Sequence, residues 1–132
     1  MSSKLPGTWA LTAHHGAPAV TVYPIIVFTR HRSVIERVEF TDAGALGVWE
    51  PGEEEDEFQF MIIRYNATPP AGAPPGTVGE RLRFKNHFTG PNSFTGDGCV
   101  EFVDANGNFL QTLGPTTHTA VRMQLQPWTN PC

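Results

Sequence analysis

Hydrophobic and β-branched side chains recur at every second position along most of the chain, and short clusters of Gly, Pro, Asn and Asp separate these segments. An alternation with period two is typical of strands that bury one face, and the clusters supply turn residues. No window shows an apolar stripe of helical period with capping signals. We therefore predict eight strands: Thr8 to His15, Thr21 to Arg30, Val34 to Phe40, Ala45 to Glu50, Glu57 to Tyr65, Glu80 to Phe88, Phe94 to Val103 and Asn108 to Gln126.

The connections between these segments are mostly too short for parallel crossovers, so sequential antiparallel hairpins are the simplest topology. Eight such strands close into an up-and-down barrel whose interior is filled by side chains or holds one small ligand. The alternative is an open two-sheet sandwich. The last strand is long, and we expect it to bend at Gly114-Pro115. The fold class predicted is all-β, an eight-stranded antiparallel barrel formed by a single domain over residues 1–132.

Composition narrows the classes of partner. The net charge is −4 with a pI near 5.7, which argues against nucleic-acid binding. No stretch approaches the roughly 18 apolar residues that span a bilayer, and the first six residues lead directly into a strand rather than an apolar signal core. We expect a cytoplasmic protein with no membrane partner, a monomer or homodimer. Cys99 and Cys132 match no disulfide framework or zinc motif, so we expect no metal.

Two connections differ from the tight turns. The segment Ala67 to Gly79 is long and rich in Pro and Gly, and it is either a solvated excursion or a lid over a cavity. Residues 53–57 are five consecutive acids, which are expected to form an exposed turn.

The first predicted strand begins near Gly7-Thr8-Trp9, and the last contains Arg122. Through this combination the chain resembles the calycin group of lipocalins, fatty-acid-binding proteins and avidin-like barrels. Small bacterial calycin-like barrels are similar to this chain in three further segments, namely Gly47-Val48-Trp49-Glu50, Phe94-Thr95-Gly96 and residues 104–108. The resemblance implies that the Trp9 indole, covered by the Arg122 guanidinium, closes one end of the barrel. Some barrels of this size, of the allene oxide cyclase and spirotetronate cyclase types, are cofactor-free enzymes.

Two histidines are candidate catalytic residues. If the first strand rises from Trp9, alternation places His15 on the same side near the open end, and His118 shares the face of Arg122. A histidine lining a cavity can act as an acid or a base near neutral pH. The alternative is that each is a satisfied or an exposed histidine.

Three polar residues are candidate ligand contacts. Asn86 alternates with inward apolar residues, and a buried amide needs a hydrogen-bond partner in protein, water or ligand. Arg64, if it faces inward near the mouth, could hold a carboxylate or enolate, although it could also extend to water. Tyr23 offers a phenolic donor, or packs at the rim. Cys99 and Glu101 are expected to face outward.

Aromatic side chains are expected to supply most of the contact area of a pocket, namely Phe28, Trp49, Phe60 and Phe84. The sequence therefore predicts a barrel that encloses a small hydrophobic molecule. One hypothesis is a cofactor-independent isomerase or cyclase of a secondary metabolite. The alternative hypothesis is a non-catalytic binding or carrier protein. No cofactor is expected in either case.

Overall fold

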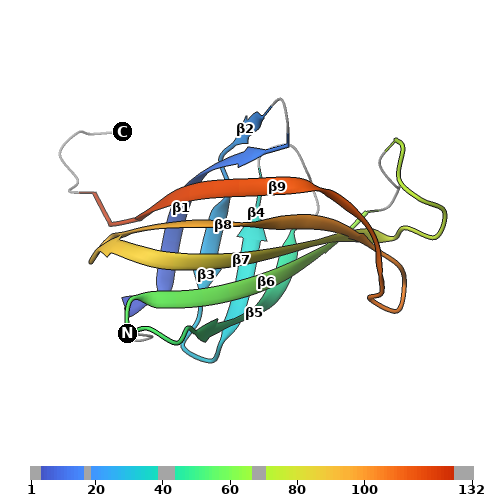
Figure 1. The fold of residues 1–132 in the computed structure, drawn as a ribbon. Helices are drawn as coiled ribbons and strands as arrows, with labels where there is room; N and C mark the ends of the chain where they lie inside the picture. Colours follow the sequence, from blue (N-terminus) through green and yellow to red (C-terminus); the bar gives the residue numbers. More distant parts are fainter. Residues whose placement is uncertain (1–3, 17–18, 39–43, 67–70, 127–132) are drawn as a thin grey trace.

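The computed structural model describes residues 4–16, 19–38, 44–66 and 71–126, which form strands joined by turns and loops (Figure 1). The strands are β1 (Gly7–His15), β2 (Val20–Val22), β3 (Ile25–Phe28), β4 (Ser33–Arg37), β5 (Ala45–Pro51), β6 (Glu57–Tyr65), β7 (Gly79–Gly90), β8 (Ser93–Val103) and β9 (Phe109–Arg122). From β3 to β9 each strand pairs antiparallel with the next. β1 pairs with β3 on one side and with β9 on the other, so the sheet closes. The predicted closed, antiparallel, all-β barrel is confirmed.

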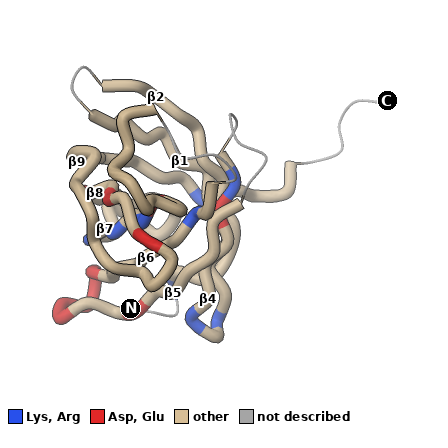
Figure 2. The backbone as a smooth tube through the Cα atoms, turned by 90° about the vertical axis from the view of Figure 1, so that its right-hand side faces the viewer, with Lys and Arg blue, Asp and Glu red and all other residues tan. Residues whose placement is uncertain are grey.

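The two ends of this barrel differ. Figure 2 looks along it from the right-hand side of Figure 1, and the labelled strands follow one another around a closed wall. Trp9 pairs with Arg122 at one end, which we call the closed end, and His15 pairs with Thr116 toward the other, which we call the mouth. Within the described residues, no helix is long and apolar enough to cross a membrane.

The second predicted strand is divided into β2 and β3 by Tyr23 and Pro24. Pro24 has no N–H group to donate to the ladder. Its carbonyl still accepts a hydrogen bond of 2.9 Å from the Leu11 amide. The register against β1 is the same on both sides, because Val22 pairs with Ala13 and Ile25 with Ala10. β2 and β3 therefore act as one interrupted strand, and the barrel has eight strands.

The last strand bends where the sequence indicates. Val100 pairs with Gly114, whereas the next residue, Glu101, pairs with Thr112, so the register shifts at this point. Gly114 has a φ of +147°, which other residues rarely adopt. The strand ends at Arg122 rather than at Gln126. The C-terminal part of the strand predicted to reach Phe40 lies outside the described residues.

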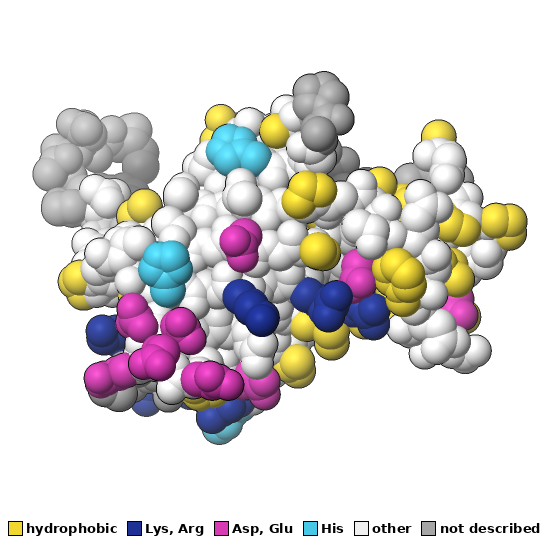
Figure 3. Space-filling model, viewed as in Figure 1, with side chains coloured by type: hydrophobic (Ala, Val, Ile, Leu, Met, Phe, Trp, Pro, Cys, Tyr) yellow, Lys and Arg dark blue, Asp and Glu magenta, His cyan; other side chains and the backbone are white. Residues whose placement is uncertain are grey.

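Residues 53–56 of the acidic run form an exposed turn between β5 and β6, as predicted, and Glu57 begins β6. Acidic side chains gather at the lower left of Figure 3. Part of the Pro-rich connection, residues 67–70, lies outside the described residues. The remainder is hydrogen-bonded to the barrel through the backbone: the N–H of Asn66 donates to the Val78 carbonyl, and the N–H of Val78 donates to the Val103 carbonyl.

The closed end is sealed by Trp9 and Arg122. The guanidinium carbon of Arg122 lies 4.4 Å from the centre of the indole ring, and its Nη1 donates to the Pro6 carbonyl at 2.9 Å. Gly7 leaves room for this guanidinium, because a Cβ there would lie 2.7 Å from Nη1. The Trp9 indole in turn donates to the Leu5 carbonyl at 2.9 Å. The arrangement implied by the calycin resemblance is therefore present.

A second tryptophan and arginine pair joins the turn between β3 and β4 to β5. The Arg32 guanidinium carbon is 5.1 Å from the ring centre of Trp49, whose indole nitrogen donates to the Thr29 carbonyl at 2.8 Å. Thr29 and Arg32 belong to the turn between β3 and β4, so this pair fastens that turn to β5. Trp49 is thus a structural residue of the closed end, in addition to being a predicted ligand contact.

Replacing Arg122 with methionine is expected to lower the free energy of unfolding by about 2 kcal/mol, since the cation–π contact and the hydrogen bonds to the N-terminal segment are lost together. Chemical denaturation of the variant measures this. Arg37→Met is the control, because Arg37 is exposed on the outer wall. A loss no larger than that of the control would contradict the stabilising role of Arg122.

Candidate functional site

The interior next to the closed end is filled by aromatic rings. Phe58 and Phe94 meet edge to face with their centres 5.0 Å apart, and Phe60 and Phe84 lie 4.9 Å apart. Phe28 contacts three of these rings and is almost fully buried. Three predicted pocket aromatics, Phe28, Phe60 and Phe84, therefore contact each other or their neighbours within a packed core.

Asn86 and His118 meet above this core across a glycine. Asn86, Gly96 and His118 are direct neighbours on β7, β8 and β9. The Asn86 Oδ1 and the His118 Nε2 lie 2.6 Å apart, and a Cβ on Gly96 would lie 1.9 Å from that oxygen. Gly96 therefore provides the space in which the two side chains bond. Both residues face inward, as the alternation indicates.

The protonation of His118 follows from its surroundings. The Asn86 amide nitrogen lies 3.5 Å from the Phe58 carbonyl, so Oδ1 is the acceptor and His118 Nε2 carries the hydrogen. Burial lowers the pKa of His118 to about 3, and His15 acts in the same direction. His118 is consequently a neutral imidazole at physiological pH, and its Nδ1 is a bare acceptor.

Gly96→Ala is expected to lower the free energy of unfolding by roughly 3 kcal/mol, because the new methyl group overpacks the core and separates Asn86 from His118. Thermal or chemical denaturation measures the loss. Gly90→Ala, at a turn where the nearest atom is the Ser93 hydroxyl at 3.1 Å, is the matched control. The loss should be smaller in an Asn86→Ala background, where the closest obstacle is absent; full additivity would contradict this explanation.

The mouth contains a cavity of about 330 Å³. Apolar side chains form much of its wall, and three charged or titratable residues project among them: His15, Arg64 and Glu80. The complete lining is His15, Gly16, Val20, Arg64, Glu80, Leu82, Val100, Leu113, Gly114 and Pro115. The structure thus brings together two of the predicted site residues, His15 and Arg64. Such a volume is at the lower end of small-molecule pockets.

Arg64 is held inside the barrel by two carboxylates. Its Nη2 donates to Glu36 Oε1, and its Nη1 lies 3.4 Å from Glu80 Oε2. Arg64 and Glu36 are only 9% and 3% exposed. The expectation that Arg64 could extend to water is therefore wrong. Ala45 lies between Glu36 and Arg64 in the sheet, and its small side chain lets the longer ones meet above it.

Burial perturbs the other ionisable groups of the mouth. Burial raises the pKa of Glu36, against the opposing effect of the Arg64 charge and hydrogen bond. Burial lowers the pKa of His15, and Arg64 and His14 act in the same direction. The mouth therefore favours an uncharged His15 next to a guanidinium that is shared by two carboxylates.

Four buried polar atoms along this interior have no hydrogen-bond partner among the described residues: His15 Nδ1, Arg64 Nε, Thr116 Oγ1 and His118 Nδ1. Thr116 pairs directly with His15, and His118 follows two positions further into the barrel on the same face of β9. Unpaired polar atoms are costly in a folded interior. Their concentration between the mouth and the aromatic core marks this path as the candidate site.

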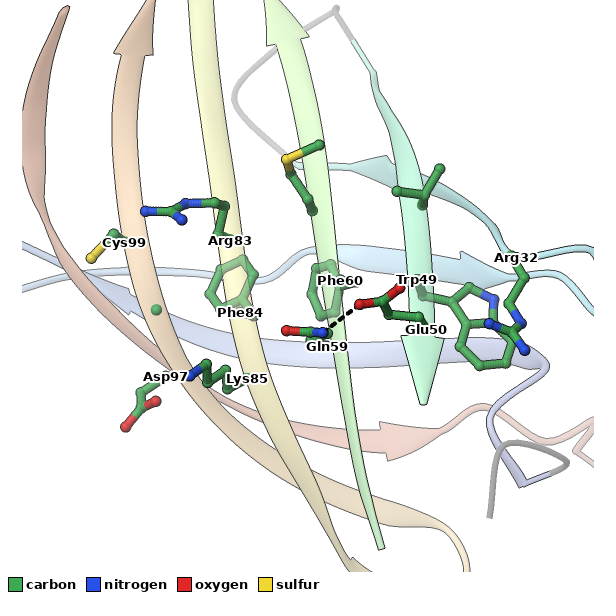
Figure 4. A pocket seen from close by; sticks show the side chains of 13 residues that line it. Arg32, Trp49, Glu50, Gln59, Phe60, Arg83, Phe84, Lys85, Asp97 and Cys99 are labelled. Atoms are coloured by element: carbon green, nitrogen blue, oxygen red, sulfur yellow. Dashed lines mark hydrogen bonds between the residues drawn. The ribbon is translucent and has the colours of Figure 1, made fainter. Parts of the chain in front are cut away.

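A larger hollow, of about 680 Å³, lies on the outer wall across β5 to β8 (Figure 4). Several of its polar side chains bond to one another or to neighbours. Gln59 donates to Glu50 at 2.5 Å, and the Arg83 Nε donates to Glu101 at 2.8 Å. Cys99 also lines this outer hollow, as expected from its face of β8. The outer hollow is a weaker candidate than the mouth, because none of the buried polar atoms that lack a partner among the described residues belongs to its lining.

The remaining predicted site residue, Tyr23, is 57% exposed at the break between β2 and β3 and is not part of the cavity lining. Sequence reasoning missed Glu36, Glu80 and Thr116. Alternation places Glu36 between Val34 and Val38, but Ile35 on the opposite face made the inward face of this strand ambiguous.

These features define a closed eight-stranded antiparallel barrel with a polar mouth above an aromatic core. Comparison with known proteins gives no family assignment: no family model matches the chain, and no curated protein matches it.

Proposed function

We propose that this protein is a calycin-like barrel that binds one small, mainly apolar molecule in its mouth. The observation that carries the proposal is the cavity of about 330 Å³, whose apolar wall ends on buried polar atoms that have no partner in the described part of the chain. Apolar walls supply contact area, and a few polar groups fix orientation. The packed rings beneath the cavity limit its depth, so we expect the ligand to occupy the mouth rather than the whole barrel.

Binding without chemistry fits the state of His118 best. A histidine with a pKa of about 3, bonded to Asn86, is a weak base at neutral pH and a poor proton donor. Of the two predicted catalytic histidines, only His15 lines the cavity. We therefore place the non-catalytic binding function first.

A cofactor-independent isomerase or cyclase is the second candidate. His15 favours it, because its Nδ1, which has no partner within the described ranges, lies in a cavity that also contains Arg64 and Glu80, so a proton acceptor and a cation share one small space. If catalysis occurs, a bound metabolite is chemically altered on incubation, and His15→Gln abolishes the change. A ligand recovered unaltered supports the carrier.

The binding function is tested with a neutral fluorescent probe, N-phenyl-1-naphthylamine. Leu82→Trp fills the cavity from its wall and should reduce probe binding at least about tenfold, equivalent to 1.4 kcal/mol. Leu46→Trp is the matched control, because Leu46 is 67% exposed on the outer wall. Failure of the parent protein to bind the probe, or equal binding by both variants, would refute a ligand site in the mouth.

A further inference from the structure

The charges of the mouth restrict the polar group of a ligand that binds there, and this inference rests on the proposed binding function. Arg64 is the cation of the cavity lining, and both Glu36 and Glu80 are already within ion-pair distance of it. One guanidinium against two carboxylates leaves a formal charge of −1. A ligand carboxylate would add a third negative charge and would have to displace Glu80 from Arg64.

Glu80 is the more available of the two carboxylates. Its contact with Arg64 is a single one of 3.4 Å, its side chain is partly exposed, and it lines the cavity. Glu36 is buried behind Arg64 and is not part of the lining. A carboxylate has two oxygens and about four acceptor positions, so Glu80 can accept a further hydrogen bond from a ligand.

The nearby nitrogen atoms also suit a donor. His15 Nδ1 is buried without a partner among the described residues and is available as an acceptor in one tautomer. Deeper along the same face, His118 Nδ1 is an acceptor because Nε2 is bonded to Asn86. The two acceptors favour a group that donates hydrogen bonds, and the partly exposed Glu80 carboxylate favours one that carries positive charge.

We propose that the mouth binds small apolar molecules that bear an amine, and that it discriminates against carboxylates. The ammonium group pairs with Glu80 and donates toward His15, while the apolar body contacts Leu82, Val100 and the other aliphatic residues of the lining. This assignment differs from the sequence-based expectation that Arg64 would hold a carboxylate or an enolate.

The test compares three compounds with the same ring: cyclohexylmethylamine, cyclohexylmethanol and cyclohexanecarboxylate. Each is titrated into the 132-residue chain at pH 7, and binding is followed by NMR chemical shifts. We expect the amine to bind about tenfold or more tightly than the carboxylate, with the alcohol between them. A carboxylate or alcohol that binds as tightly as the amine overturns the inference, even though binding itself then stands.

A charge-matched pair of variants separates the role of Glu80 from net charge. Glu80→Gln should reduce the ratio of amine affinity to alcohol affinity severalfold. Glu54→Gln removes the same charge from the exposed acidic turn and should leave that ratio as in the parent. Equal ratios in both variants overturn the assignment to Glu80. If no compound binds and the neutral probe also fails, the proposed function itself is refuted, and this inference with it.

Discussion

Replacing Arg64 with methionine is expected to lower the free energy of unfolding by about 3 to 5 kcal/mol at pH 7. The substitution keeps much of the side-chain volume but leaves the Glu36 carboxylate, which is 3% exposed, without its cation. An unpaired charge in such a place is far less stable than the same charge in water. Glu80 loses the same partner, but its greater exposure lessens the effect. Denaturant unfolding monitored by tryptophan fluorescence measures the loss.

A double-mutant cycle assigns this loss to the ion pair. Glu36→Gln combined with Arg64→Met removes both charges, and we expect the double variant to be more stable than Arg64→Met alone. Arg83→Met is the matched control: its side chain is 56% exposed and pairs with Glu101 on the outer wall, so we expect a loss of about 1 kcal/mol or less. If the loss in the double variant equals the sum of the losses in Glu36→Gln and Arg64→Met, the ion pair does not account for the effect of Arg64→Met.

Much of the wall of the barrel follows from local pattern. On β7 the charged residues Arg81, Arg83 and Lys85 alternate with Leu82 and Phe84, and the structure buries the apolar members, as predicted. Local alternation suffices here because polarity differs sharply between the two faces of the strand. The calycin resemblance implied that Trp9 faces inward, and alternation from Arg122 placed His118 on the same face; both are buried.

The ion pair of the mouth could not be predicted in the same way. Glu36 and Arg64 are 28 positions apart in sequence, and they meet only because β4, β5 and β6 are neighbours and Ala45 between them is small. A lone arginine in an otherwise apolar alternation more often extends to water, so the general rule predicts exposure for Arg64, which the structure shows to be buried. Long-range pairing of this kind depends on register, which a single sequence does not specify.

The packing of the aromatic residues against one another could not be predicted from the sequence either. Alternation indicated that Phe28, Phe60 and Phe84 face inward, but not whether they line a cavity or fill it. The distances between rings answer this, since centres 4.9 to 5.3 Å apart leave no room for a ligand between them. The open space described for the interior is therefore the cavity at the mouth, whose wall is largely aliphatic and includes His15, Arg64 and Glu80.

The stability of the protein is expected to fall by about 1.4 kcal/mol for each pH unit below about 6.5, because of His118. Burial lowers the pKa of this imidazole to about 3 in the folded state, whereas the unfolded chain titrates near 6.5. Between these values the unfolded state binds a proton that the folded state does not. Acidification from pH 6.5 to 4.5 therefore costs about 2 kcal/mol, and the stabilisation is complete above the unfolded pKa.

Two other groups act on the same pH range. The pKa of His15 is also lowered, so His15 adds to the loss on acidification. The pKa of Glu36 is raised, so its effect has the opposite sign: the folded state holds that proton more tightly, and stability falls as the pH rises through the raised value. The contribution of His118 is therefore measured as the difference between the parent protein and His118→Gln.

Urea unfolding of both proteins at several pH values from 7 to 4.5 provides this difference. His118→Gln removes the titrating group while keeping an amide that can bond to Asn86. The unfolded state of this variant should therefore take up about one proton fewer on acidification, and its free energy of unfolding should depend less steeply on pH. His87→Gln is the control, because His87 is exposed on the outer face of β7 and its replacement should leave the slope of the parent. If His118→Gln keeps the full slope, His118 does not titrate as a buried neutral imidazole, and the assignment of Nδ1 as an acceptor in the interior fails with it.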